Sequence, residues 1–216
     1  MSKFIQQRTI KRQVSASGIG LHTGKIVNFT LKPASADTGI IFKRLDIENA
    51  EIIKAQPEMV FDTMLCTQIG ENPKQRIGTV EHIMSALFGY GVDNVVIEID
   101  GPEIPIFDGS SASFMLLIES AGIKKQSEPK KFIKIMNKVR VEEDDKFAEF
   151  TPNDVFSLEL CIDFNHPVIP KQRKSFEIVN GFYQKEIARA RTFCFQKDVE
   201  QMQSIGLALG GGLDNA

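Results

Sequence analysis

The chain has 216 residues, of which 42% are hydrophobic and 25% charged, and its formal net charge at pH 7 is −2. These values are typical of a globular protein with a sizeable core, and they allow one large domain or two small ones. A nearly neutral chain has no general attraction to nucleic acid or to an anionic membrane surface. A phosphate-bearing ligand would therefore need a local basic pocket, and we expect no nucleic-acid partner.

The cysteines and the apolar runs indicate the compartment. Cys66, Cys161 and Cys194 lie far apart and form no CxxC pair, which argues against a disulfide framework or a thiolate zinc knuckle. The opening residues MSKFIQQRTIKRQ lack the apolar stretch of a signal peptide, and the longest apolar run, residues 114–118, is too short to cross a bilayer. We expect a cytoplasmic protein without stable membrane insertion, and the oligomeric state is not predictable.

The first half of the chain predicts a sheet followed by two helices. Glycine and proline signals separate its apolar runs, and the polar stretch 44–78 is typical of a loop or small insertion, which is often functional. Ser110 or Ser111 would cap the second helix and Gly122 would end it. The expected elements are strands at 8–14, 25–33, 38–44 and 92–100, a turn at 15–20, helices at 79–89 and 110–122, and a rigid connection at 101–109.

The second half begins after a charged stretch, KKQSEPKK at 124–131, which favours a linker. The order strand, turn, strand, strand then recurs, so a duplication is one of two open interpretations. We predict an α+β protein with a first domain at 1–125 and a second at 126–216. The second half lacks a counterpart of residues 79–122, which predicts about 50 to 90 further residues after 216. Its expected elements are strands at 131–141, 146–152, 156–164 and 191–195, a turn at 142–145, and helices at 180–190 and 197–206.

The helix at 79–89 carries the candidate site. With Thr79 as N-cap, Glu81 and His82 are its second and third residues, and their side chains diverge by about 100°, so they can line two walls of one site. A helix N-terminus favours a carboxylate and keeps an imidazole neutral, which is the form that binds a metal. The predicted core stripe of the helix consists of Val80, Ile83, Met84, Leu87 and Phe88.

The residues alone leave two interpretations of this pair open. Glu81 could simply complement the helix dipole while His82 is a surface histidine. No second His, Asp or Glu follows His82 within four residues, so this is not the two-histidine zinc helix, and other ligands would come from distant segments. The opposite helix face is small, with Ser85 and Gly89, which indicates close packing or a cleft.

Several long motifs extend over the whole chain. They are GIGLHTGK at 18–25, DTMLCT at 62–67, TVEHIMSALFG at 79–89, DNVVIEI at 93–99, PEIPIFDGS at 102–110, IDFNHP at 162–167 and ARARTFCF at 188–195. Together they resemble the UDP-3-O-acyl-N-acetylglucosamine deacetylase family, which makes lipid A in Gram-negative bacteria. The resemblance implies a zinc amidase that removes the acetyl group from the sugar nitrogen of UDP-3-O-acyl-N-acetylglucosamine. It also implies two similar α+β domains with helices packed between outward-facing sheets.

The resemblance assigns catalytic roles to three residues. His82 would be a zinc ligand, Glu81 the general base that takes a proton from the attacking water, and Thr192 a hydrogen-bond donor to the developing oxyanion. Zinc would lower the pKa of water to about 7 and polarise the amide carbonyl.

The resemblance also implies substrate-binding residues. Met64, Leu65 and Cys66 would border the zinc site and the entry to an acyl passage, although a small satellite core is the plain alternative. Phe193 and Phe195 would line that passage, although they could equally be ordinary core residues on one strand face. The remaining implied contacts are Leu21 beside the ligand groove, Phe164 on the uracil ring and Asp198 at the nucleotide-sugar end.

The remaining metal ligands of the family do not match this sequence. Its second and third zinc ligands lie on an HxxxD helix, and a further histidine acts as an acid. His22 and His166 are the other histidines here, and neither precedes an aspartate by four residues. We therefore expect a C-terminally truncated chain that is inactive by itself. The alternatives are a non-catalytic fragment that retains part of the acyl-UDP-sugar groove, and a structural domain with no ligand.

Overall fold

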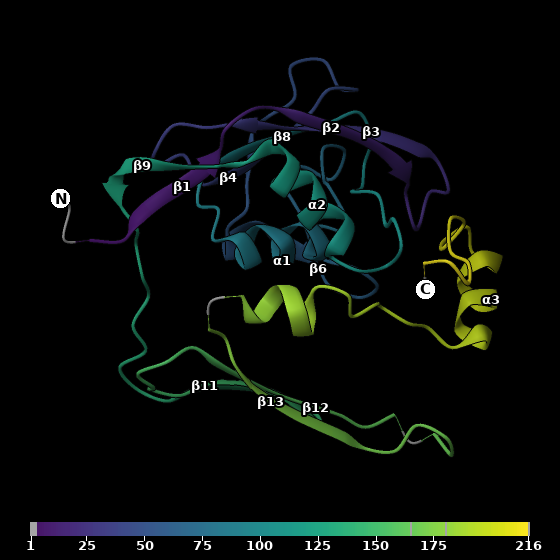
Figure 1. Ribbon diagram of the computed structural model, residues 1–216. Helices are drawn as coiled ribbons and strands as arrows, with labels where there is room; N and C mark the ends of the chain where they lie inside the picture. The colour runs from purple at the N-terminus through teal and green to yellow at the C-terminus, as the bar shows by residue number, and fades with distance from the viewer. Residues whose placement is uncertain (1–3, 165, 180, 216) are drawn as a thin grey trace. The chain divides into compact units, whose positions relative to one another are not determined.

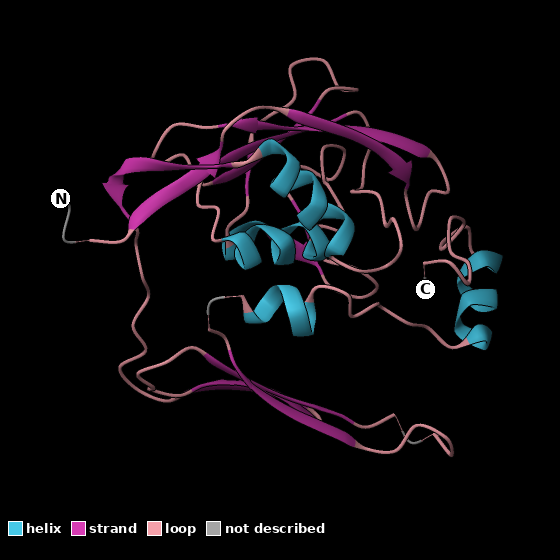
Figure 2. Cartoon of the chain, viewed as in Figure 1, coloured by secondary structure: helices cyan, strands magenta, loops and turns pink. Residues whose placement is uncertain are grey.

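The computed structural model describes residues 4–164, 166–179 and 181–215. Contacts divide the chain into two compact units, which we call unit 1, Met1–Lys130 with Ala188–Ala216, and unit 2, Lys131–Ile187. Both helices and sheets are present, so the predicted α+β class is confirmed (Figure 2). The division at residue 125 and the duplication remain predictions.

Unit 1 is built on a five-stranded sheet with the order β2-β3-β8-β4-β5. Its strands pair antiparallel, except that β4 and β8 run parallel. A separate ribbon joins β1 to β9, and β6 pairs with β7. The elements of unit 1 are β1 Gln6–Ile10, β2 Val14–Ile19, β3 Ile26–Pro33, β4 Ile40–Arg44, β5 Ile53–Lys54, a 3-10 turn Pro57–Met59, β6 Val60–Asp62, β7 Gln68–Ile69, α1 Glu81–Tyr90, β8 Val95–Ile99, α2 Ala112–Ala121, β9 Ile123–Pro129 and α3 Gln196–Ser204.

The sheet turns one apolar face inward because its strands alternate. Val27, Phe29 and Leu31 of β3 are buried, whereas the side chains between them are more exposed. The pattern repeats in β8, where Ile97 and Ile99 are fully buried. Successive side chains of a strand point to opposite faces, so this period of two places a continuous apolar layer on one side of the sheet.

Helices α1 and α2 cover that layer, below the sheet as drawn in Figure 1. Phe114 of α2 is fully buried, with its ring centroid 5.9 Å from that of Phe29 and 4.9 Å from that of Phe107. Such tilted and edge-on aromatic pairs add about 0.5–1.5 kcal/mol each to the free energy of burial. This aromatic cluster anchors the segment between β8 and α2, which later proves to border the candidate site.

Two sequence predictions in unit 1 are wrong. Residues 15–20 lie almost entirely in strand β2, which pairs with β3 from Val14 to Ile19. Residues 124–131, expected as a linker, lie largely in β9, which pairs with β1. Both segments are polar and carry weak local signals, and they form strands through pairing, β2 with the β3 strand that follows it and β9 with the distant β1.

The start of α1 also differs from the prediction. The N-cap position is Val80, with no side-chain cap, and Glu81 is the first helical residue. The buried face comprises Ile83, Ala86 and Leu87 in addition to Val80, whereas Phe88 is exposed, so the predicted stripe was rotated by about one position. The helix α2 is confirmed, with Ser111 at the N-cap position and Gly122 at the C-cap, φ +71°. Ser111 makes no side-chain capping hydrogen bond, because its hydroxyl donates to Ala188 O at 3.1 Å.

Unit 2 contains two antiparallel hairpins, β10 Val139–Glu143 with β11 Lys146–Phe150, and β12 Ser157–Ile162 with β13 Gln172–Glu177. The turn expected at 142–145 is present at Asp144.

Several second-half predictions are wrong. Residues 131–138 form no strand, β13 was not predicted, and the helix expected at 180–190 is only a π-helical turn, Tyr183–Ile187. Asn165 and Asn180, which fall in two of the motifs and elements predicted above, lie outside the described residues. In unit 1, residues 191–195 are extended without strand pairing, and the last predicted helix is confirmed as α3.

Among the described residues, no helix combines the length and apolarity that crossing a membrane requires.

The aromatic cluster predicts a large stability difference between two positions of α2. Phe114→Ala should lower the free energy of unfolding by about 3–5 kcal/mol, because it leaves a cavity in a packed core. Leu116→Ala is the matched control, because this side chain is 68% exposed and should change stability by less than about 0.5 kcal/mol. Urea unfolding measures both, and equal losses would contradict the assigned core.

Candidate functional site

The first turn of α1 brings Glu81 and His82 into a half-buried position. The Glu81 carboxylate does not cap its own helix; its Oε2 accepts a hydrogen bond of 3.0 Å from the backbone N–H of Thr67. The backbone N–H of Val80 donates to the carbonyl oxygen of Thr67 at 3.4 Å. The loop that contains the DTMLCT motif therefore orients the carboxylate.

Burial lowers the pKa of His82 below its ordinary value, and the negative charges of Glu81 and Asp108 partly oppose this effect. The imidazole is thus favoured in its neutral form near pH 7. A neutral imidazole has a free nitrogen lone pair and can ligate a metal or accept a proton. The electrostatic influence of Asp108 also shows that the 102–110 motif lies near this helix.

The segment Pro102–Ile106 lies between two other motifs and is hydrogen-bonded on both edges. On one edge, the N–H of Gly78 donates to Pro102 O at 2.9 Å and the N–H of Ile104 donates to Gly78 O at 3.0 Å. On the other edge, the N–H of Ile106 donates to Ile19 O at 3.0 Å. This short strip ties the glycine-rich turn near residue 20 to the residues that precede α1.

Glu103 strengthens the same junction with its side chain. It is 3% exposed, and its carboxylate accepts hydrogen bonds from the backbone N–H of His22 at 3.1 Å and of Thr23 at 2.7 Å. The hydroxyl of Thr79 donates to Oε2 at 3.3 Å. A buried carboxylate requires such donors because leaving it unsatisfied costs more than the 1–3 kcal/mol that is typical of neutral groups.

The turn at Asp108 and Gly109 receives the ARTF motif. Arg191 donates from Nε to the Asp108 carbonyl at 2.7 Å, and the backbone N–H of Thr192 donates to the Gly109 carbonyl at 2.9 Å. Arg191 also donates to Leu213 O at 3.1 Å. These bonds attach Arg191 and Thr192 to the turn, and residues 191–195 form no strand.

The glycine-rich segment after α3 packs against the GLHTG turn. The N–H of Gly210 donates to Leu21 O at 2.9 Å, and the N–H of Leu209 donates to His22 O at 3.3 Å. A Cβ atom at Gly210 would overlap the carbonyl of Gly20, so only glycine fits this approach. Leu21 therefore lies where two motifs meet.

The three predicted site residues of the DTMLCT loop differ in solvent exposure. Cys66 is buried, and desolvation raises the pKa of its thiol, with smaller contributions of the same sign from the charges of Glu81 and Glu103. Met64 is 80% exposed and Leu65 is also exposed. The alternative of a satellite core therefore fits Cys66 but not Met64 or Leu65.

The remaining predicted site residues are not brought to α1 by any described contact. Phe193 and Phe195 stack edge-on with ring centroids 6.2 Å apart, and Asp198 lies in the first turn of α3. Phe164 is an exposed residue of unit 2. Their substrate contacts remain predictions.

Sequence reasoning missed three residues that build the site: Glu103, Asp108 and Arg191. The 101–109 segment was interpreted as a rigid connection, and its motif at 102–110 contributed to the family resemblance without a role for any single residue. A signal was nevertheless present, because Glu103 is a single charge in the otherwise apolar run PEIPIF, a context in which burial with compensating donors is expected. No comparable signal marks Arg191.

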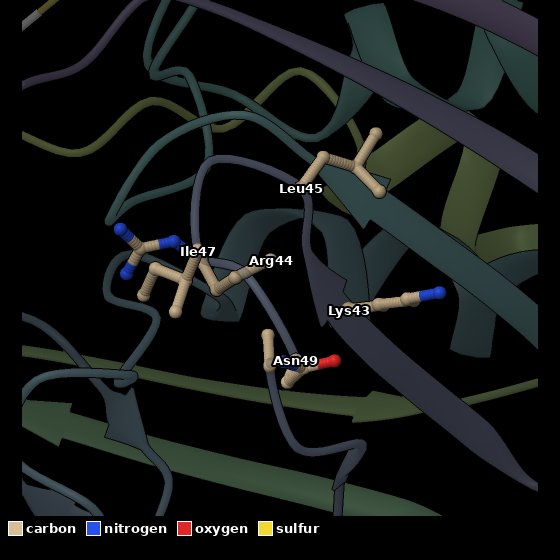
Figure 3. Close-up of a pocket in the computed structure, with 6 residues that line it drawn as sticks. Lys43, Arg44, Leu45, Ile47 and Asn49 are labelled. Atoms are coloured by element: carbon tan, nitrogen blue, oxygen red, sulfur yellow. The ribbon is translucent and has the colours of Figure 1, made fainter.

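One pocket of unit 1 lies in the connection after β4 and encloses about 520 Å³ (Figure 3). Its basic character is partly neutralised, because Arg44 forms an ion pair of 2.6 Å with Asp46 and also donates to Arg76 O at 2.8 Å. The predicted site residues are absent from its lining, which consists of Lys43, Arg44, Leu45, Ile47, Asn49 and Ala50.

The described residues do not form a complete metal site. Within residues 4–164, 166–179 and 181–215, no group of three His, Cys, Asp or Glu side chains is placed to hold a metal ion. A catalytic zinc site needs three protein ligands and an open position. Unit 1 therefore offers His82 as a ligand without a chelating set around it.

An α+β unit that presents a carboxylate and a neutral imidazole on one helix turn has the groups of a hydrolase site. The family model of the UDP-3-O-acyl N-acetylglycosamine deacetylases matches residues 7–216. Deacetylases of that name from Vibrio parahaemolyticus and Acidithiobacillus ferrooxidans are each 49% identical over 215 residues, and the one from Pasteurella multocida is 51% identical over 216.

These alignments cover 99% of this chain and 70% of each of the three relatives. The chain therefore belongs to the UDP-3-O-acyl-N-acetylglucosamine deacetylase family, a family of hydrolases.

The environment of Cys66 predicts slow alkylation. Its thiol is 8% exposed and its pKa is raised above the ordinary value of 9.0, so little thiolate is present at pH 8. Iodoacetamide should modify the exposed Cys161 first, as followed by peptide mass spectrometry. Glu81→Gln removes a charge that raises the Cys66 pKa, so it should accelerate modification of Cys66 at a fixed pH. Equal rates at Cys66 and Cys161 would contradict the buried placement.

Proposed function

We propose that this protein takes part in zinc-dependent hydrolysis of the acetamide of UDP-3-O-acyl-N-acetylglucosamine, giving UDP-3-O-acyl-glucosamine and acetate. This reaction is the committed step of lipid A biosynthesis, and we place it in the cytoplasm. The observation that carries the proposal is the arrangement around the first turn of α1, where the 62–67 loop bonds to Glu81 and Asp108 of the 102–110 segment influences the pKa of His82. The 18–25 and 188–195 motifs bond in turn to the 102–110 segment. Family membership supports the same reaction.

Glu81 is the proposed general base. Its Oε2 is held by the Thr67 amide, which sets the direction of the carboxylate. The other carboxylate oxygen can then accept a proton from the attacking water, provided that the scissile carbonyl lies within hydrogen-bond reach of this turn. Later donation of that proton to the sugar nitrogen would complete amide cleavage.

His82 is the proposed zinc ligand, and its lowered pKa supports this role because metal binding requires the neutral ring. When bound, zinc supplies Lewis-acid polarisation of the amide carbonyl and a more acidic water. A catalytic zinc site would need two further protein ligands beside His82, and the described residues form no group of three donors.

Thr192 is the proposed donor to the oxyanion. Its backbone N–H donates to the Gly109 carbonyl, and its neighbour Arg191 donates to the carbonyls of Asp108 and Leu213. These hydrogen bonds restrain the backbone that carries Thr192. Preorganised donors of this kind stabilise developing charge without reorganisation during the reaction. We further propose substrate contacts for Leu21, Met64, Leu65, Cys66, Phe164, Phe193, Phe195 and Asp198.

The alternative is a non-catalytic chain that retains only part of the acyl-UDP-sugar groove. The observation that favours it is the lack of a three-residue donor group among the described residues. The two proposals differ in whether a complete metal site can be assembled in the complete gene product, and turnover by that product decides between them.

The first functional prediction concerns Glu81. In the complete gene product, Glu81→Ala should lower kcat by about 10²–10⁴-fold, the contribution expected of a general base. Stability should fall by only about 1 kcal/mol, through loss of the Thr67 hydrogen bond, and this shifts the melting temperature by about 2–4 °C. Steady-state kinetics and thermal melting measure the two effects. Near-normal turnover would sink the assignment.

The second functional prediction concerns the 216 residues by themselves. We expect this polypeptide neither to bind zinc with sub-micromolar affinity nor to deacetylate, because one imidazole leaves the other coordination positions to exchanging water. Isothermal titration of the apo chain with zinc tests the first point, with His82→Gln as the control. A single tight site that is lost in His82→Gln would show that the donor-set argument is wrong.

A further inference from the structure

We propose that Glu103 is a positioning residue that holds Thr79 in a strained conformation and thereby aims the first turn of α1. The proposal rests on the function proposed above for Glu81 and His82. Glu103 is a buried carboxylate that has no role in the mechanism proposed above. Its hydrogen bonds go to His22, Thr23 and Thr79, so it would act on Glu81 and His82 only through Thr79.

The starting observation is the backbone of Thr79. Its φ of +56° lies in the left-handed region, which is costly for a β-branched residue. Such a conformation persists only where the surroundings determine it. Thr79 is 1% exposed and lies two residues before Glu81, so the strained residue immediately precedes the N-cap of the helix that carries the candidate site.

Three hydrogen bonds determine that conformation. The residue before Thr79 is held through both of its backbone polar groups, since Gly78 bonds to Pro102 and Ile104. The Thr79 hydroxyl donates to Oε2 of Glu103 at 3.3 Å. Because Glu103 lies between these two backbone partners in the chain, the same short strip fixes the backbone and the side chain together.

Glu103 itself is fixed from the opposite side. The amides of His22 and Thr23 donate to its two oxygens at 3.1 and 2.7 Å. A Cβ atom at Gly20 would overlap Oε1, so the turn closes tightly around the carboxylate. With both oxygens engaged and almost no exposure, the carboxylate has no freedom to follow a displaced Thr79. The Glu103 carboxylate is therefore a fixed hydrogen-bond acceptor for the Thr79 hydroxyl.

The consequence for catalysis is geometric. If the Glu103 carboxylate is removed, Thr79 can relax toward a negative φ, and the direction of the first turn of α1 changes as a result. Glu81 and His82 would then be misplaced relative to each other and to the Thr67 amide. A misplacement of about 1 Å can reduce a rate about 10²-fold while leaving distant substrate contacts unchanged.

The test uses two variants of the complete gene product. Glu103→Gln keeps the side-chain volume but places an amide N–H₂ among donors, and Thr79→Val keeps the shape but removes the hydroxyl. Both should lower kcat, by up to about 10²-fold for Glu103→Gln, while KM changes little. Glu98→Gln is the control, because it also removes one negative charge from unit 1 but breaks only an ion pair with Lys32.

Hydrogen exchange supplies the readout that does not depend on turnover. In Glu103→Gln the amides of His22 and Thr23 should exchange faster, whereas those of Ile97 and Ile99 in the central strand should not. Thr79→Ser keeps the hydroxyl, which also hydrogen-bonds with the Cys66 thiol, and should therefore retain most of the kcat that Thr79→Val loses.

The outcomes separate this inference from the proposed function. Faster local exchange with an unchanged kcat in both variants would overturn the positioning role while leaving Glu81 as the base. If Glu103→Gln does not fold, Thr79→Val decides alone, because a normal kcat there overturns the proposal. Normal turnover in Glu81→Ala would instead overturn the proposed function, and hence the catalytic purpose of Glu103, whatever the exchange rates are.

Discussion

The site depends on one buried carboxylate that joins two stretches of chain that are distant in the sequence. The Glu103 carboxylate accepts hydrogen bonds from the backbone N–H groups of His22 and Thr23. It also accepts one from the hydroxyl of Thr79, which precedes α1. A carboxylate with 3% exposure would be strongly destabilising without these donors. The arrangement is therefore cooperative: each segment satisfies a charge that in turn fixes the other segment.

Local strain is found at two positions that adjoin this junction. Thr79 precedes the helix turn with Glu81, and Phe107, with φ +52°, precedes Asp108. Phe107 is held by aromatic contacts with Phe29 and Phe114, so the core of unit 1 determines its unusual backbone. A non-glycine residue with positive φ costs on the order of 1–3 kcal/mol, which a packed core or a buried hydrogen bond can offset. In both cases the strained backbone sets the direction of a nearby side chain of the candidate site, Glu81 after Thr79 and Asp108 after Phe107.

The sequence predicted those parts of the fold in which a local pattern decides the structure. Strands β3, β4 and β8 and helices α1, α2 and α3 follow from apolar periodicity, and the family was recognisable from motifs that span the chain. Periodicity failed for β2 and β9, because their polar residues form strands only through pairing, β2 with the neighbouring β3 and β9 with the distant β1. Thr79 looked like an N-cap because threonine before a helix usually is one. Its hydroxyl instead serves a buried acceptor that no local rule could reveal.

The candidate site was predicted less completely, for a related reason. Glu81, His82 and Thr192 were identified from motifs, whereas Glu103, Asp108 and Arg191 act through backbone groups and buried contacts. The Arg191 guanidinium donates hydrogen bonds to two backbone carbonyl oxygens, those of Asp108 and Leu213. Every residue has such a carbonyl, so these contacts do not restrict which residue type accepts them. Any side chain could stand at the accepting positions, so the sequence constrains only the donor. Side chains with a candidate chemical role can therefore be proposed from the sequence, whereas side chains that act on backbone carbonyls require the structure.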